Sequence, residues 1–538
     1  MVRNALAFVA LGASLAGGIA VSRGHARAPM TCDVAIIGGG PCGLATAIAL
    51  SKARSLKRCT VRVFERDHLE PKGAAVALSP LAWAVLEAID GTASARIRRE
   101  GSPVEAVDMR PLHTRDASAG DAAAAAARDA KPGPPVLHAL WAAWLRALGL
   151  GERVQTTFLW HDVRAHLAVR ARELLGPQGV ALGVDLVAIE PTRAPEHGHE
   201  GLTLRFRRLN RDAEREADEL VCHARLVLAC DGVQSAVRAA APAGPRAAEI
   251  LLDEEKSVWR GISPTTDVRG RATFYKDTGA GAGASASAGR MGVLFPAGRG
   301  RGASWTVTAP AVPGRARDFA DARARLLTAL GAPADGGAAA RAAGPSADAA
   351  GVVAVVDEVF AAALAASSCI VEHRLVSRNW DAPWYSGVPR VAYLGDAAHP
   401  LRPTGEGLAL AFEDAWTLGK LAADANSADD FLRPQTLRAY ETARLGRVRA
   451  VADATSAAAR AAYAGGGARA PPTQPPARTV APAAAGAHGA GRLVEVAVPA
   501  HAALGRADAR PRDAGAARAL TLAEAVAAHP LHAPLGPL

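Results

Sequence analysis

The stretch Asp33-Val-Ala-Ile-Ile-Gly-Gly-Gly-Pro-Cys-Gly43 decides the fold of this chain. Residues 33–37 form an apolar run of strand length, and a run of glycines follows at once. Residues 44–50, Leu-Ala-Thr-Ala-Ile-Ala-Leu, have the composition of a helix. The order of strand, glycine turn and helix predicts the start of a parallel α/β unit.

Each glycine of this turn has its own task in a dinucleotide site. Gly38 permits the tight turn, Gly40 lets the backbone approach a pyrophosphate, and Gly43 lets the helix pack closely on the strand. The helix N-terminus offers unpaired N–H groups to the anion. A glycine-rich turn without a ligand is the alternative, and the flanking strand and helix disfavour it.

A second predicted strand, residues 60–64, ends at Glu65, where an acid accepts hydrogen bonds from the adenosine ribose. Arg66 and Asp67 follow it. A carboxylate at this place disfavours a 2′-phosphate and fits FAD or NAD equally well. The fingerprint alone therefore does not choose the cofactor.

Two later segments place an aspartate at the end of a predicted strand. Residues 225–229 run into Asp231-Gly232, and residues 390–394 run into Gly395-Asp396. The carboxyl ends of the strands are where ligands bind in open parallel α/β sheets. Both aspartates are therefore candidate binding residues.

With these motifs the sequence resembles the FAD-dependent aromatic hydroxylases and epoxidases of the para-hydroxybenzoate hydroxylase fold. The resemblance spans about residues 31–460. It rests on Gly38-x-Gly40-x-x-Gly43, Asp231-Gly232-x-x-Ser235-x-x-Arg238 and Gly395-Asp396-Ala-Ala-His-Pro400, with weaker similarity at Trp259-Arg260-Gly261 and Tyr440-Glu441-x-x-Arg444.

The resemblance implies a set of residues that hold FAD. In it, Asp396 binds the ribityl chain, Asp231-Gly232 lies near the pyrophosphate, and a helix that begins near Gly407 directs its positive end at the flavin. The implied cofactor-binding residues are Gly38, Gly40, Gly43, Glu65, Arg66, His138, Asp231, Gly232, Gly395, Asp396, Pro403, Gly405 and Gly407.

The chain departs from the family at three positions. Many members have an arginine that contacts FAD at the start of the helix that we expect at residues 137–148, where His138 stands nearest here. Glu406 replaces the usual glutamine between two glycines, and Ala409 replaces a common asparagine. A glutamate beside a reduced, anionic flavin is repulsive unless it points away or is protonated. These differences bear on catalysis rather than on fold.

The activity that the resemblance implies is an FAD-dependent monooxygenase. It would use NADPH or NADH and O₂ to hydroxylate or epoxidise a small aromatic or polyene molecule. Two alternatives stay open: a flavin-dependent reductase or dehydrogenase on the same fold, and a non-catalytic FAD-fold binding protein. The catalytic residues are unknown, and we expect His399, between Ala398 and Pro400, to be a structural loop residue.

We expect an α/β fold with a Rossmann-like FAD-binding domain, a mixed-sheet substrate domain and a disordered C-terminal tail. Residues 31–465 form the monooxygenase module, with FAD-binding segments at about 31–110, 150–240 and 390–465, and a substrate domain at about 245–390. Residues 466–538 are rich in Ala, Gly and Pro and predict a low-complexity tail. No separate NADPH domain is expected.

Residues 1–30 resemble a targeting or signal/anchor segment. An apolar run, residues 5–21, follows Arg3 and precedes small residues, which is typical of a signal peptide. A single membrane anchor, a plastid transit segment and translation from Met30 instead are the alternatives. The predicted location is the secretory pathway, a plastid or a membrane if residues 1–29 are translated, and the cytoplasm otherwise.

Composition excludes several other classes of function. The net charge of +10 is spread along an Arg-rich chain with only seven lysines, so no nucleic-acid partner is expected. The six cysteines form no CxxC pair, so neither a zinc site nor any other metal site is expected. Serine and histidine form no nucleophile elbow, which disfavours a hydrolase.

Overall fold

The computed structural model describes residues 29–70, 73–112, 155–192, 200–209, 219–241, 251–277, 290–314, 316, 318–330, 358–382, 384, 387–402 and 405–463. Residues 1–28, the helix expected at 137–148 with His138, Pro403 and the tail after 463 lie outside this range. Predictions for them stay predictions.

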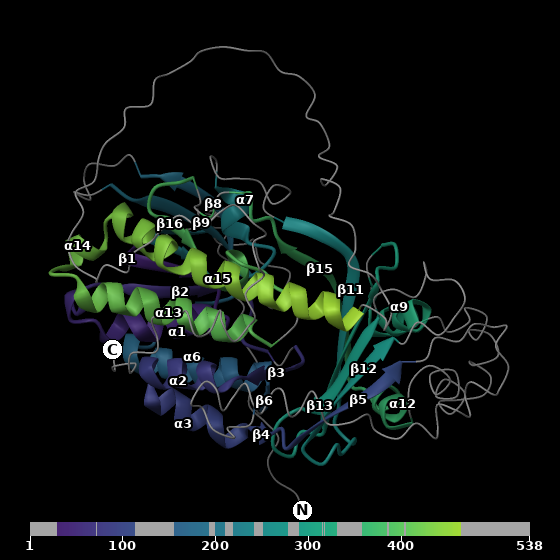
Figure 1. Cartoon of the computed structure of the whole chain (residues 1–538). Coiled ribbons are helices and arrows are strands. Elements are labelled where there is room, and N and C mark those ends of the chain that lie inside the picture. Colours follow the sequence, from purple (N-terminus) through teal and green to yellow (C-terminus); the bar gives the residue numbers. More distant parts are fainter. Residues whose placement is uncertain are drawn as a thin grey trace, which may run out of the picture.

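A seven-stranded sheet forms the centre of the larger layer (Figure 1). Its order is β7-β2-β1-β10-β9-β8, with β16 beside β10, and the strands from β7 to β10 and β16 are parallel. The bounds are β1 Met30–Ile37, β2 Val61–Glu65, β7 Val180–Leu182, β8 Val184–Pro191, β9 Leu202–Arg208, β10 Glu219–Ala229 and β16 Val391–Tyr393.

The central strands of this sheet are buried on both faces because helices and loops cover each side. Val34 and Ile36 face one hydrophobic core while Ala35 and Ile37 face another. This explains why the strand is a continuous apolar run. The covering helices are α1 Pro41–Lys52, α2 Pro80–Ile89, α3 Gly91–Glu100, α6 Trp160–Leu175, α7 Ala236–Ala240, α13 Gly407–Asp424, α14 Ala428–Phe431 and α15 Pro434–Tyr463, with short 3₁₀ turns Arg54–Leu56 and Gly395–Ala397.

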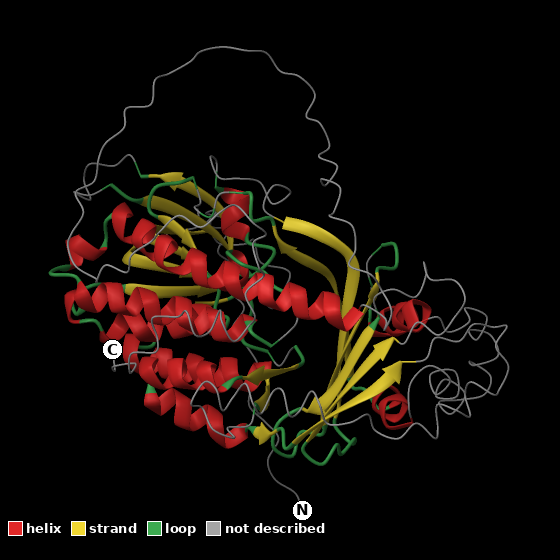
Figure 2. Ribbon diagram, viewed as in Figure 1, coloured by secondary structure: helices red, strands yellow, loops and turns green. Residues whose placement is uncertain are grey.

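A second, mixed sheet has six strands in the order β15-β11-β14-β13-β12-β5. All its neighbours are antiparallel except β12 and β5. The strands are β5 Ala106–Leu112, β11 Leu251–Ser263, β12 Arg271–Asp277, β13 Met291–Pro296, β14 Ala303–Pro310 and β15 Cys369–Arg378, and helices α9 Phe319–Leu330 and α12 Glu358–Ala365 cover one face. Figure 2 shows this sheet beside the helix layer of the first.

A third sheet has three strands, β3 Ala75–Leu78, β6 Thr156–Leu159 and β4 Ser102–Pro103. The predicted α/β class with a Rossmann-like sheet and a second, mixed sheet is confirmed. Strand β5 also belongs to the mixed sheet, although most of it lies in a segment that was expected to bind FAD. Among the described helices, none is long and apolar enough to cross a membrane.

Candidate functional site

The three motifs of the sequence meet where β1, β10 and β16 end. The strand ends are joined by hydrogen bonds from Cys230 N–H to Ile37 O (2.7 Å) and from Leu394 N–H to Ala229 O (2.9 Å). Segments that lie some 190 and 360 residues apart along the chain therefore border a single edge of the sheet. This is the edge at which parallel α/β sheets bind ligands.

The glycine turn has the geometry that its sequence predicts. Gly38 has φ +105°, and a Cβ there would lie 2.4 Å from the Cys230 carbonyl oxygen. A Cβ on Gly43 would lie 2.0 Å from the Gly38 oxygen, so the start of α1 needs a glycine to pack on the strand. A Cβ on Gly40 would meet nothing within 4 Å. Space is therefore free in front of Gly40, where a pyrophosphate would approach.

Glu65, the last residue of β2, binds the backbone of the glycine turn. Its carboxylate accepts hydrogen bonds from Gly39 N–H (2.6 Å) and Asp67 N–H (2.9 Å). It is only partly buried and retains acceptor capacity for ribose hydroxyls. Arg66, which follows it, is exposed.

Arg164 on α6 is the basic residue that the sequence analysis missed. Its guanidinium donates to Gly39 O (2.9 Å) and to Asp67 (2.5 Å), and it lies 3.4 Å from Glu65. It is 1 % exposed. Both α6 and α13 pack against α1, and α6 carries this arginine in its first turns, while His138 lies outside the described residues. No pattern in the sequence distinguishes Arg164 from Arg170 and Arg172 of the same helix.

The second motif forms a compact cap after β10. Val237 N–H donates to Asp231 (3.0 Å), and Ser235 accepts from Arg238 N–H (3.1 Å). Gly232 has φ +78° and open space beside it. Burial raises the pKa of Asp231, and its Oδ1 has no hydrogen-bond partner within the described part of the chain. Asp231 therefore keeps one acceptor free.

Two arginines donate hydrogen bonds to the backbone of the third motif. Arg238 donates to Ala397 O, and Arg378 donates to Ala398 O (2.7 Å). Burial lowers the pKa of Arg378 to about 10, and the nearby charge of Arg238 acts in the same direction. The second and third motifs are therefore directly connected through the backbone of residues 397–398.

Asp396 follows β16 at the edge of the sheet where the three motifs meet. Its side chain is exposed to solvent, yet desolvation by the surrounding protein raises its pKa. No described group donates a hydrogen bond to this carboxylate. A Cβ on Gly407, the first residue of α13, would lie 3.8 Å from Asp396 Oδ1.

The helix start predicted near Gly407 is confirmed, since α13 begins there. Gly405 precedes it with φ +93°, a backbone conformation that favours glycine. The N-terminus of this helix lies close to Asp396, as the close approach of Gly407 indicates. Pro403 lies outside the described residues, so its predicted place beside the flavin is untested.

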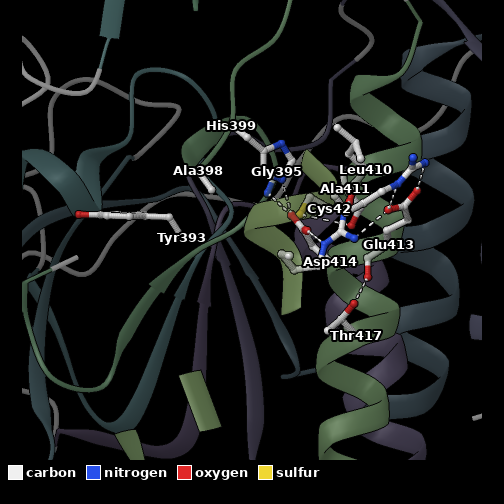
Figure 3. A network of polar contacts seen from close by, with 12 residues as sticks. Cys42, Tyr393, Gly395, Ala398, His399, Leu410, Ala411, Glu413, Asp414 and Thr417 are labelled. Carbon is white, nitrogen blue, oxygen red and sulfur yellow. Dashed lines mark hydrogen bonds and ion pairs between the residues drawn. The ribbon is translucent and has the colours of Figure 1, made fainter. Parts of the chain in front are cut away.

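A buried ionic network lies directly behind this loop (Figure 3). Asp414 accepts from Gly395 N–H (2.8 Å) and Arg444 (2.6 Å) and bonds to His399 Nε2 (2.7 Å). Arg444 also donates to Glu413 (2.7 Å). Burial by itself would raise the pKa of Asp414, but the charges of His399 and Arg444 outweigh it and lower the value to about 2.

His399 is completely buried in this network, which fits the structural role expected for it. Trp384 stacks on its ring at 5.6 Å between centroids. The network fixes Gly395 and His399, the residues on either side of the Asp396 turn. The shape of the binding loop therefore depends on α13 and α15.

Glu406 stands immediately before α13. Burial raises its pKa to about 7, Arg447 opposes this shift and Glu413 adds to it. The carboxyl group is consequently half protonated near neutral pH. This removes much of the repulsion toward an anionic ring that a glutamate at this position would otherwise cause.

Three aromatic residues of the mixed sheet belong to its core. Trp259, Trp305 and Tyr275 are at most 1 % exposed and pack beneath α12, where Tyr275 stacks on Phe360 at 4.7 Å. Phe295 points to the opposite, half-open face of the mixed sheet. Strand alternation separates the two sets.

Comparison with known proteins identifies the fold. No protein-family model and no curated protein sequence matches the chain. Solved structures do match it. Klebsiella pneumoniae HpxO, solved with FAD and uric acid, has 18% identity and a TM-score of 0.52 over 80% of this chain and 89% of its own. Pseudomonas aeruginosa PqsL, in complex with 2-aminobenzoylacetate, has 20% identity and a TM-score of 0.52 over 80% of this chain and 97% of its own.

The tetracycline destructase Tet(51) is a further match, with 13% identity and a TM-score of 0.50 over 81% of this chain. At such identities the likeness concerns the fold. The chain has the fold of FAD-dependent monooxygenases, as its three motifs predict.

Proposed function

We propose that the protein is an FAD-dependent monooxygenase that uses NADPH or NADH and O₂ to hydroxylate or epoxidise a small aromatic or polyene molecule. The observation that carries this proposal is Asp396, an exposed carboxylate that accepts no hydrogen bond from any described residue and lies beside the start of α13. Hydroxyl groups of a ribityl chain are the donors that such a carboxylate lacks.

The other residues of the site fit the remaining parts of the cofactor. Gly40 leaves room for a pyrophosphate, Glu65 would accept from the ribose, and Arg164 places a cation at the same turn. The positive end of α13 would stabilise negative charge that develops on the ring. Bound FAD supplies the chemistry that activates O₂.

The chain's own residues would bind and orient the acceptor molecule and would exclude water from it. The half-buried face of the mixed sheet would enclose an acceptor molecule and protect a reactive oxygen species from water. We assign no catalytic base. HpxO and PqsL were solved with small, ring-containing molecules, which supports an aromatic acceptor.

One experiment separates this proposal from its alternatives. The purified protein is examined for a flavin spectrum, and NADH, NADPH and O₂ consumption are followed with a panel of phenols and polyenes. A product that has gained one oxygen atom supports the monooxygenase. Nicotinamide oxidation without such a product supports a reductase or dehydrogenase.

Bound flavin that neither nicotinamide reduces would support a non-catalytic binding protein. A colourless protein that takes up no FAD on reconstitution would refute all three functions. His138 and Pro403 are tested in the same assay, because their substitution should weaken FAD binding if they contact it.

A further inference from the structure

Strand β11 contains a β-bulge where it pairs with β15. The register shifts between Asp253 and Ser257, so the three residues 254–256 lie opposite a single residue of β15, Leu375. Within this bulge Glu255 has φ +56°, a backbone conformation that non-glycine residues rarely adopt. Such strain persists only where the surrounding structure fixes it, and bulges often redirect a side chain beside a binding site. The contacts of the bulge residues therefore indicate its role.

Glu254, the first residue of the bulge, connects the mixed sheet to the loop that follows β16. Its Oε2 forms an ion pair with Arg402, and its Oε1 accepts a hydrogen bond from Ser377 Oγ on β15 (2.6 Å). The side chains of Glu254 and Arg402 are only 19% and 24% exposed, so water screens this pair less than it screens a surface pair. Both carboxylate oxygens are engaged, which holds Glu254 in one orientation.

Lys256, the third residue of the bulge, lies near the same ion pair. Burial lowers the pKa of Lys256, the positive charge of Arg402 lowers it further, and the negative charge of Glu254 opposes both. The carboxylate of Glu254 thus acts on two cations at once. Its removal would leave Arg402 and Lys256 to repel each other, which would drive the side chain of Arg402 away from the bulge.

Residues 395–402, which we call the cofactor loop, are held from two sides. The buried ionic network and the two arginines described above hold the loop as far as His399. Arg402 lies beyond these contacts, just before the segment with Gly405 that leads into α13. The ion pair with Glu254 therefore fixes a part of the loop that the buried network does not contact, and it does so from the other sheet.

We infer that Glu254 is a positioning residue of the cofactor site, which holds the cofactor loop through Arg402 in the conformation that binds FAD. This inference rests on the proposed function, since it assigns a further residue to the same site. Glu254 acts through Arg402 rather than on the cofactor itself. The bulge in β11 serves to place its carboxylate where the regular pairing of β11 with β15 would not.

Glu254→Gln tests the inference in the full-length protein, because it removes the charge and keeps the size of the side chain. FAD affinity, titrated by flavin fluorescence, should fall about three- to tenfold. Arg402→Gln should have a similar effect, and the double variant should bind FAD no more weakly than the weaker single variant. Arg402→Lys keeps the charge and should retain most of the affinity. Additive losses in the double variant would show that the two residues act separately, which contradicts the inference.

The matched control is Asp253→Asn. Asp253 precedes Glu254 in the chain but pairs with Arg374 within the mixed sheet, and both side chains are exposed, so FAD affinity should equal that of the wild type. Equal losses of affinity in Asp253→Asn and Glu254→Gln would overturn the inference. It is also wrong if Glu254→Gln shifts the midpoint of urea unfolding while the folded protein keeps its FAD affinity, because the ion pair then only stabilises the fold.

Hydrogen exchange tests the position of the cofactor loop without any flavin. Its backbone includes His399 N–H, which donates to Gly395 O (2.8 Å). In the flavin-free protein, peptides that cover residues 395–402 should exchange about five- to tenfold faster in Glu254→Gln than in the wild type, and equally fast in Asp253→Asn. A wild type that binds no FAD would refute the proposed function, yet faster exchange in Glu254→Gln would still support its hold on the loop. Equal exchange would overturn the inference.

Discussion

Asp396 and Asp414 belong to neighbouring parts of the same region and differ in every electrostatic respect. Asp414 is completely buried, has three partners and a pKa of about 2. Asp396 is exposed, accepts no hydrogen bond from any described residue and has a raised pKa. Charges that the protein itself satisfies determine the shape of the loop, whereas those it leaves unsatisfied are available to a ligand.

The largest expected effect comes from removing one charge of the buried ionic network around Asp414. Asp414→Asn should lower the free energy of unfolding by about 3–5 kcal/mol, because it leaves the buried Arg444 only partly compensated. Urea unfolding measures this. Since the pKa of Asp414 lies below its ordinary 3.8, its stabilisation is complete above pH 3.8 and is lost as the pH falls toward 2.

Glu87→Gln is the control for this variant. Its carboxylate pairs with Arg98 at the surface, with side chains 61% and 54% exposed, so the change should be below about 1 kcal/mol. Equal losses of unfolding free energy in Asp414→Asn and Glu87→Gln would show that the buried network stabilises the fold no more than a surface ion pair does.

The second effect concerns binding rather than stability. Asp396→Asn should weaken FAD binding by about ten- to hundredfold, since charge-assisted hydrogen bonds to the ribityl hydroxyls are lost. In the flavin-free protein its free energy of unfolding should stay within about 0.5 kcal/mol of the wild type. A stability loss as large as that of Asp414→Asn would abolish the distinction between the two aspartates.

Two alanine substitutions in the glycine turn allow the same comparison between an effect on stability and an effect on binding. Gly43→Ala should destabilise the protein by about 1–3 kcal/mol, because its Cβ would overlap the Gly38 carbonyl. Gly40→Ala has open space and φ −75°, so stability should be unchanged while FAD binding weakens about tenfold. Thermal unfolding without flavin and FAD titration separate the two. Equal FAD affinity in Gly40→Ala and the wild type would contradict a pyrophosphate at this turn.

The smallest effect is the pH dependence of Glu406. Its pKa of about 7 lies above the ordinary 4.5, so its ionisation destabilises the folded state as the pH rises through this interval. Glu406→Gln should remove about 1 kcal/mol of this decline, a value reduced for partial exposure. Unfolding at pH 5 and pH 8 measures it. A decline of the same size in both proteins would assign the titration to another group.

Several parts of the site could be predicted from sequence because they depend on neighbours along the chain. The strand, turn and helix around Gly38–Gly43 require only local geometry, and so does the helix start at Gly407. Arg164 could not be identified in this way. It shares α6 with Arg170 and Arg172, and only packing against α1 shows which arginine meets the turn.

For the aromatic residues of the mixed sheet, too, the sequence left open which of them are buried. Alternation along a strand predicts that Trp259 and Arg260 point to opposite faces, but not which face a helix covers. In the structure, α9 and α12 cover the side of Trp259 and leave that of Arg260 half-open.

The sequence by itself determined the nucleotide-binding turn, the aspartates at the strand ends and the two-sheet α/β architecture, because apolar periodicity and glycine spacing express local backbone requirements. Only the tertiary structure decided which charges find partners. Asp414 meets Arg444 and His399, while Asp396 and Arg260 meet no described partner, because these distances are set by packing between segments far apart along the chain.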